Sequence, residues 1–187
     1  MKKKMVPSLL LLLASILVTG VACKNNPAHP VAGALPDLPQ LDGLKEISRA
    51  KPPVESITLS KVEAERNTLV KSTILASIPG QDAPDSQQLV RNITKDVGKL
   101  KSIVPEYNYQ LSDVKETVIN GNPACTYVIT SSAKGKKSSR RSLDCSWKKS
   151  LYRFEVGVLS PTLNSSDELY ASELFDKYSI ILKDKLK

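Results

Sequence analysis

The chain has 187 residues, of which 41% are hydrophobic and 25% are charged, and these values are ordinary for one soluble domain with a substantial core. The formal net charge is +8, but Lys2–Lys4 at the extreme N-terminus contribute three of these charges. Without them, 24 of the 27 basic side chains remain against 19 acidic ones. Because this excess is small and no nucleic-acid-binding motif accompanies it, it indicates a solvated surface, and no nucleic-acid partner is expected.

Residues 1–22 have the pattern of a signal peptide. Lys2–Lys4 form a basic start, Val6–Val18 supply an apolar segment that is short for a membrane span, and small residues follow. The next residue, Cys23, resembles the lipidated cysteine of bacterial lipoproteins, although Gly20 occupies the position where leucine is commonest. The resemblance implies that Cys23 becomes the N-terminus and carries acyl chains such as palmitate, which anchor the protein in a membrane. An ordinary cleaved signal with an unrelated cysteine is the alternative.

The residue after this cysteine bears on the location within the cell envelope. In enterobacterial lipoproteins an aspartate there implies retention in the inner membrane, and this chain has Lys24 instead. For a Gram-negative host, the resemblance therefore implies an outer-membrane location, facing the periplasm or the cell surface.

Residues 23–54 are predicted to form a lipidated, proline-rich tether. Six of the 12 prolines lie there, and proline-rich segments are extended and semi-rigid. Five apolar residues recur at every third position, which is the period of a polyproline II helix: Leu35, Leu38, Leu41, Leu44 and Ile47. We expect this stripe to pack against the protein's own domain. A docking strip for a partner and a short helix over residues 41–47 are the alternatives.

The folded domain is predicted to span residues 55–187. Residues 56–62 and 69–78 predict two strands, because they alternate between apolar and polar side chains. A helix over residues 62–78 is the rival interpretation, since several apolar residues there also fit a period of 3.6. We prefer strands, because threonine and isoleucine are frequent and Pro79-Gly80 ends the run.

Two helices are predicted, over residues 86–103 and 167–185. The residue pairs expected to begin them have capping-box spacing: Asp85 with Gln88, and Ser165 with Glu168. The apolar stripe of the first helix comprises Leu89, Ile93, Val97, Leu100 and Val104. The buried face of the last helix is expected to comprise Leu169, Leu174, Phe175, Tyr178, Ile181 and Leu182.

Four consecutive antiparallel strands are predicted, over residues 107–119, 124–132, 139–147 and 151–160. The first of them leads into Asn120-Gly121, which is a strong signal for a tight hairpin turn.

The hairpin of the second and third of these strands is predicted to be centred on Gly135. This register places Cys125 opposite Cys145, and Tyr127 opposite Leu143. Cysteines on facing positions come close enough for a disulfide, which would close a loop of roughly 20 residues and stabilise the fold by about 3 kcal/mol. We therefore expect this disulfide, with two free buried thiols as the alternative.

Motifs for catalysis are missing from the predicted domain. The single histidine, His29, lies in the predicted tether, which excludes a histidine-dependent triad or metal site inside the domain. Two carboxylate pairs are expected to be solvated surface charges: Asp113 with Glu116, and Asp144 with Glu155. We expect no enzymatic activity, no cofactor and no metal ion.

The predicted hairpin tip carries a cluster of basic residues: Lys134, Lys136, Lys137, Arg140 and Arg141. Such a cluster is suited to contact an anionic lipid, lipopolysaccharide or another anionic envelope surface. No aromatic residue interleaves with it in the sequence, which argues against stacking on nucleic-acid bases. A turn that is merely kept soluble by its charge is the alternative.

The order of the predicted elements resembles the PsbP/Mog1-like α/β/α fold. The residues that carry the resemblance are Gly121, Pro123, Ala124, Leu151, Tyr152, Phe154 and Phe175. It covers about residues 55–185 and implies a non-enzymatic binding or assembly role, without supplying functional residues.

Together these features predict an α+β domain with an antiparallel sheet of five to six strands and two main helices. The expected function is that of a membrane-anchored envelope lipoprotein that serves as a binding or assembly module, with a protein or an anionic envelope component as its partner. Inhibition of a secreted hydrolase, through a protruding tip at residues 134–141, is the alternative.

Overall fold

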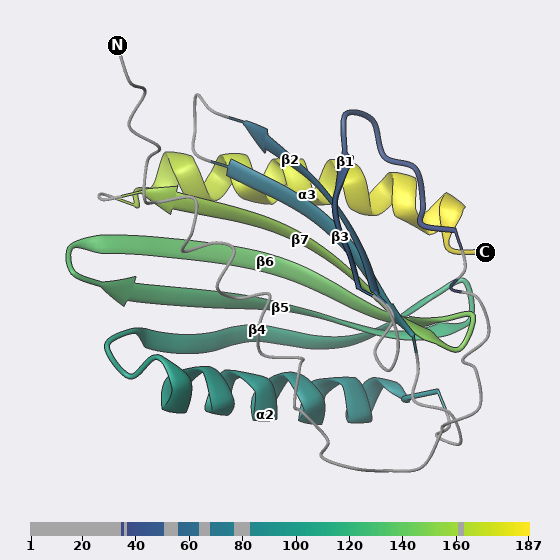
Figure 1. Ribbon diagram of the computed structural model, residues 1–187, viewed down its shortest axis with the longest axis horizontal. Coiled ribbons are helices and arrows are strands. Elements are labelled where there is room, and N and C mark those ends of the chain that lie inside the picture. The colour runs from purple at the N-terminus through teal and green to yellow at the C-terminus, as the bar shows by residue number, and fades with distance from the viewer. Residues whose placement is uncertain (1–34, 36, 51–55, 64–67, 77–82, 161–162) are drawn as a thin grey trace.

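The computed structural model describes residues 35, 37–50, 56–63, 68–76, 83–160 and 163–187 (Figure 1). The elements are β1 (Lys45–Ala50), β2 (Ser56–Glu63), β3 (Thr68–Ala76), α2 (Ser86–Ile103), β4 (Asn108–Ile119), β5 (Asn122–Ala133), β6 (Lys136–Trp147), β7 (Ser150–Ser160) and α3 (Ser165–Lys185). The predicted signal peptide, Cys23 and His29 lie outside the described residues. No helix in the described ranges is long and apolar enough to cross a membrane.

The strands form one antiparallel sheet in the order β1-β2-β3-β7-β6-β5-β4. The predicted α+β class is confirmed, and so are the strand pair over 56–78 and the four strands that follow α2. Within the described residues the sheet has seven strands where the sequence predicts five to six, because the prediction places β1 in the tether. The described residues of the 62–78 segment, 62–63 and 68–76, lie in strands, so the rival interpretation of that segment as a helix is wrong.

Helices α2 and α3 cover opposite faces of the sheet (Figure 1). Helix α3 packs on β6 and β7, and the larger apolar core lies beneath it. Helix α2 packs on β4 and β5 over a smaller core. We call these two faces of the sheet the α3 face and the α2 face.

Each helix begins at a polar cap. Asp85 accepts a hydrogen bond from the backbone N–H of Gln88 at 2.6 Å, which confirms the predicted start of α2. The predicted cap of α3 was wrong by one residue. Asn164 and Asp167 form its capping box, and the exposed Leu169 is not on the buried face.

Residues 37–50, which the sequence assigned to the tether, belong to the folded domain. Leu38 and Leu41 are buried in the α3-face core, and Leu35 and Leu44 pack against it. The segment then pairs with β2 as the edge strand β1. The expectation that the leucine stripe packs on its own domain is confirmed for these four residues, whereas Ile47 is exposed.

The predicted disulfide is wrong, because the hairpin register differs by one residue. Cys145 lies opposite Ala124 and Cys125 lies opposite Asp144. Since neighbouring residues of a strand point to opposite faces, Cys145 joins the α3-face core and Cys125 joins the α2-face core. Both cysteines are free and buried. Burial, and then the nearby Asp144, raise the pKa of each thiol to about 12.

The turn between β5 and β6 explains this shift of register. Lys134 and Gly135 both have positive φ, at 48° and 74°, as in a two-residue type I′ turn. The hairpin is therefore centred between these two residues rather than on Gly135.

Candidate functional site

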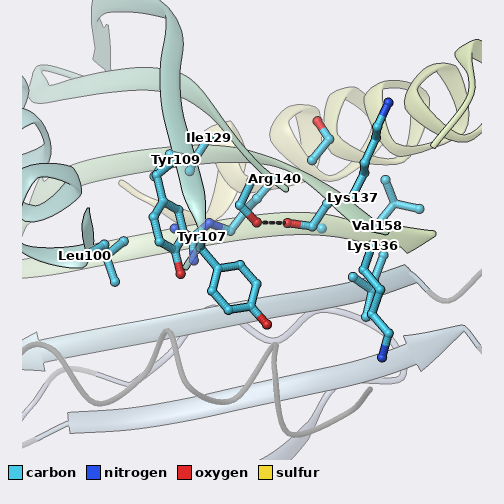
Figure 2. Close-up of a pocket in the computed structure, with 13 residues that line it drawn as sticks. Leu100, Tyr107, Tyr109, Ile129, Lys136, Lys137, Arg140 and Val158 are labelled. Carbon is cyan, nitrogen blue, oxygen red and sulfur yellow. Dashed lines mark hydrogen bonds between the residues drawn. The ribbon is translucent and has the colours of Figure 1, made fainter. Parts of the chain in front are cut away.

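The five basic residues of the predicted tip do not share one surface. Lys136 and Arg140 stand on the α2 face with Ile129, while Lys137 and Arg141 alternate to the α3 face. Lys134 lies in the turn itself. Figure 2 shows Lys136 and Lys137 extending in opposite directions. A flat anionic surface therefore does not meet all five cations at once.

On the α2 face, Lys136 and Arg140 line a shallow pocket of about 50 Å³ (Figure 2). Residues from α2, the start of β4, and β5 to β7 form its walls, among them Leu100, Tyr107, Tyr109, Ile129, Ser131, Ser138 and Leu159. We call this site the tyrosine pocket. It combines cations, aromatic rings and hydroxyl groups in one small space.

Two tyrosines stack at the rim of the tyrosine pocket. The ring centroids of Tyr107 and Tyr109 lie 5.9 Å apart with an angle of 29° between the rings. Burial raises the pKa of both phenols, so both hydroxyl groups remain protonated and able to donate hydrogen bonds at neutral pH. The hydroxyl groups of Ser131 and Ser138 share a hydrogen bond of 2.7 Å across β5 and β6.

Sequence reasoning missed these tyrosines as part of a site. The basic cluster contains no aromatic residue, and Tyr109 reaches it only because β4 pairs with β5, with Tyr109 opposite Ser131. The alternation of the 107–119 strand was the available signal, since it places Tyr107 and Tyr109 on one face.

Arg140 connects the tyrosine pocket to a buried cluster of charges. Its Nη1 atom lies 3.2 Å from Oε1 of Glu155, and Nζ of Lys71 lies 2.9 Å from Oε2 of the same carboxylate. Glu155 is only 3% exposed. Burial opposes its ionisation, but the Lys71 and Arg140 cations hold its pKa well below the usual range. Two cations thus share one carboxylate, which leaves a net charge of +1.

A second buried ion pair lies beside this cluster, and its two charges cancel. The guanidinium of Arg153 donates two hydrogen bonds to the carboxylate of Asp144, each of 2.7 Å, and Tyr127 donates a third of 3.1 Å. The prediction that Asp144 and Glu155 are solvated surface charges is therefore wrong. Their pairing gives both carboxylates structural roles, whereas Asp113 and Glu116 are exposed as predicted.

Arg140 is the cation of this charge cluster that lies at the pocket. The Nε atom of Arg140 is buried and has no hydrogen-bond partner. Its side chain is 18% exposed and lies at the tyrosine pocket, whereas Lys71 lies deeper. An anionic group in the pocket would therefore meet a cation that one shared carboxylate only partly neutralises.

No cluster suited to bind a metal ion, with three or more histidine, cysteine or acidic side chains, occurs within the described ranges.

Comparison with known proteins gives similarity of fold at low sequence identity. No protein-family model matches the sequence, and no curated protein sequence matches it. One similar structure is PA94 from Pseudomonas aeruginosa, a protein of unknown function described as a putative regulator. It is 11% identical, with 76% of this chain and 92% of that chain covered and a TM-score of 0.48.

A second similar structure is LpqN from Mycobacterium tuberculosis, which is described as involved in cell envelope biogenesis. It is 14% identical, with 75% of this chain and 79% of that chain covered and a TM-score of 0.39. At these values the similarity identifies neither a family nor a function for this chain. The resemblance to the PsbP/Mog1-like fold stays a prediction.

Proposed function

We propose that this chain is a non-catalytic binding module of the bacterial cell envelope, anchored by a lipid at Cys23. Its ligand carries an acidic group, a carboxylate or a phosphate, which binds in the tyrosine pocket. The signal-like segment before Cys23 supports the location. For a Gram-negative host the outer membrane is the favoured location, because Lys24 rather than aspartate follows the cysteine.

The proposal of an acidic ligand rests on the excess positive charge at the floor of the tyrosine pocket. Lys71 and Arg140 share Glu155, so one positive charge is left over, and Arg140 is the cation of this cluster that lines the pocket. Lys136 adds a second cation to the lining, and Lys137 also lines the pocket, although its side chain extends in the opposite direction. A carboxylate or phosphate matches this charge and the donor geometry of a guanidinium.

The size of the tyrosine pocket indicates how the ligand is held. Sites that enclose a small molecule typically measure about 300–1,000 Å³, whereas this pocket measures about 50 Å³. It therefore suits the acidic end of a larger envelope component or of a protein partner, with most of that partner outside. The faces of Tyr107 and Tyr109 provide an apolar contact beside the acidic group.

Photocrosslinking in the native envelope tests this function. A photoreactive phenylalanine in place of Tyr107 should crosslink to one dominant component, and the Lys136→Glu exchange should lower the yield about tenfold. The control position is Ile180 on α3, which is 67% exposed and far from the pocket. An absent crosslink at position 107, equal labelling from position 180, or a yield that Lys136→Glu leaves unchanged would each contradict the proposal.

The alternative, inhibition of a secreted hydrolase, predicted a protruding loop at the hairpin tip. The turn contains only Lys134 and Gly135, and Lys137 is already paired with Ser160 of β7. This geometry does not favour a loop that enters an enzyme cleft. A crosslink to a hydrolase from position 134, with none from position 107, would revive the alternative.

A further inference from the structure

The end of the sheet opposite the tyrosine pocket gathers three segments: residues 118–122, 147–150 and 183–187. Hydrogen bonds join them. The indole of Trp147 donates to the backbone carbonyl of Lys187 at 3.3 Å, and the amide of Asn122 donates to that of Leu186 at 3.1 Å. We call these three segments together the lysine end.

The lysine end is strongly basic, and its basic side chains are exposed to solvent. Its charged residues are Lys148, Lys149, Lys183, Lys185 and Lys187, all exposed, and Asp184. Counted by side chains alone, five lysines against one aspartate give these segments a charge of +4. Val118, which is 64% exposed, adds an apolar side chain at the same end.

Two of these lysines occupy backbone positions that disfavour them. Lys148 and Lys149 have φ of 48° and 59°, a region where a side chain with Cβ is strained. The two other two-residue turns between consecutive strands of the 108–160 segment place glycine second, as Asn120-Gly121 and Lys134-Gly135. Strained residues that persist in a fold often mark functional positions.

The path of the chain brings the first described residues to the lysine end. Figure 1 shows the described segment before β1 starting at the end of the molecule that holds the C-terminus. Eleven residues lie between Cys23 and Leu35, so the chain that joins the two spans at most about 40 Å when fully extended. A lipid at Cys23 would therefore tether the domain to the bilayer from this end.

We propose that the lysine end is the surface by which the domain lies on anionic lipid headgroups. The inference rests on the lipid anchor of the proposed function but not on the tyrosine pocket. The attraction acts over roughly 8 Å at physiological ionic strength. The hairpin tip is the length of β6 away, about 40 Å for 12 residues, so it is not drawn to the same membrane. The tyrosine pocket then points away from the bilayer, toward its ligand.

Trp147, the single tryptophan of the chain, provides a direct probe. It lies under Lys148, whose Nζ atom is 4.5 Å from the centre of its ring. The lipidated full chain is reconstituted into vesicles that contain phosphatidylcholine with a spin label on the headgroup. Quenching of Trp147 fluorescence should be strong when phosphatidylglycerol is added in equal amount, weak in phosphatidylcholine alone, and reduced by salt.

The double variant Lys148→Asn with Lys149→Gly separates membrane contact from folding. It gives the turn a preferred sequence, so the melting temperature should rise, while docking should weaken by about 30-fold for two lysines. The matched control, Lys134→Asn with Lys137→Ser, removes two cations from the opposite end and should leave quenching unchanged.

Quenching that does not depend on phosphatidylglycerol, or that only the control variant abolishes, would overturn the inference. Mass spectrometry of the membrane-extracted chain tests the acyl group on Cys23 separately. Failure of the anchor is thereby distinguished from failure of the lysine contact.

Discussion

Glu155 is a single residue that makes the stability of the folded sheet depend on pH. It is buried between Lys71 of β3 and Arg140 of β6, and these cations hold its pKa well below the usual range. In the unfolded chain the carboxylate takes up a proton near pH 4.3. The folded protein takes up this proton only at much lower pH. Between these two pH values, acid therefore favours the unfolded chain.

The Glu155→Gln exchange should therefore destabilise the protein at neutral pH and reduce its sensitivity to acid. Removing one partner of a buried ion pair costs about 3 kcal/mol of unfolding free energy. Urea unfolding between neutral pH and roughly pH 3 measures both effects. Glu116→Gln, at an exposed position, is the control and should change the unfolding free energy by less than about 0.5 kcal/mol. An unchanged acid dependence in Glu155→Gln would contradict this role for the carboxylate.

The two domain cysteines show how sensitive a residue's role is to register. Cys125 and Cys145 are separated by the sheet itself, each in its own core. The sequence predicted them as partners because a turn centred on Gly135 places them opposite each other. A shift of one residue in the pairing moves them to opposite faces.

At the scale of elements, short-range signals define the helices and turns. The N-cap of α2, the capping box of α3, the Asn120-Gly121 turn and the alternation of the strands each act within a few residues. These signals locate the start of an element only to within about one residue. Asn164 with Asp167, and Ser165 with Glu168, have the same spacing, and only the backbone geometry shows that the first pair caps α3.

The exchange Asn164→Ala tests this assignment of the cap. It removes the side-chain oxygen that accepts from the backbone N–H of Asp167 at 3.0 Å. The expected loss is about 1 kcal/mol of unfolding free energy, or roughly 3 °C in melting temperature. The neighbouring exchange Ser165→Ala should have almost no effect in the same thermal melt. A larger loss for Ser165→Ala than for Asn164→Ala would return the cap to the predicted residue.

At the scale of the whole molecule, the leucine segment before β1 completes the α3-face core. Leu38 and Leu41 are 6% and 4% exposed, and Tyr178 of α3 donates a hydrogen bond of 3.5 Å to the backbone carbonyl of Asp42. The proline content of the region indicated an extended chain, and residues 37–44 do lack a helix or strand. An extended chain can still be buried, which composition does not reveal.

Replacing Leu38 or Leu41 with alanine should lower the unfolding free energy by about 3 kcal/mol each, because each leaves a cavity in the core. A tether outside the domain would show no such loss. Ile47→Ala, at an exposed position of β1, is the control and should cost less than about 0.5 kcal/mol. Chemical unfolding of the three variants measures the difference. Equal stability of all three would place the segment outside the core.

The sequence by itself determined the fold class, both helices within two residues of their ends, and most strands, because these depend on neighbours along the chain. Only the tertiary structure decided which residues from different strands lie next to one another. Lys71 meets Glu155 because β3 pairs with β7, and Tyr109 meets Arg140 because β4 and β6 flank β5. These residues are remote in sequence, and a one-residue difference in pairing reverses the face each one occupies. The tyrosine pocket, the buried charges and the free cysteines therefore follow from strand order and register, which no local pattern in the chain determines.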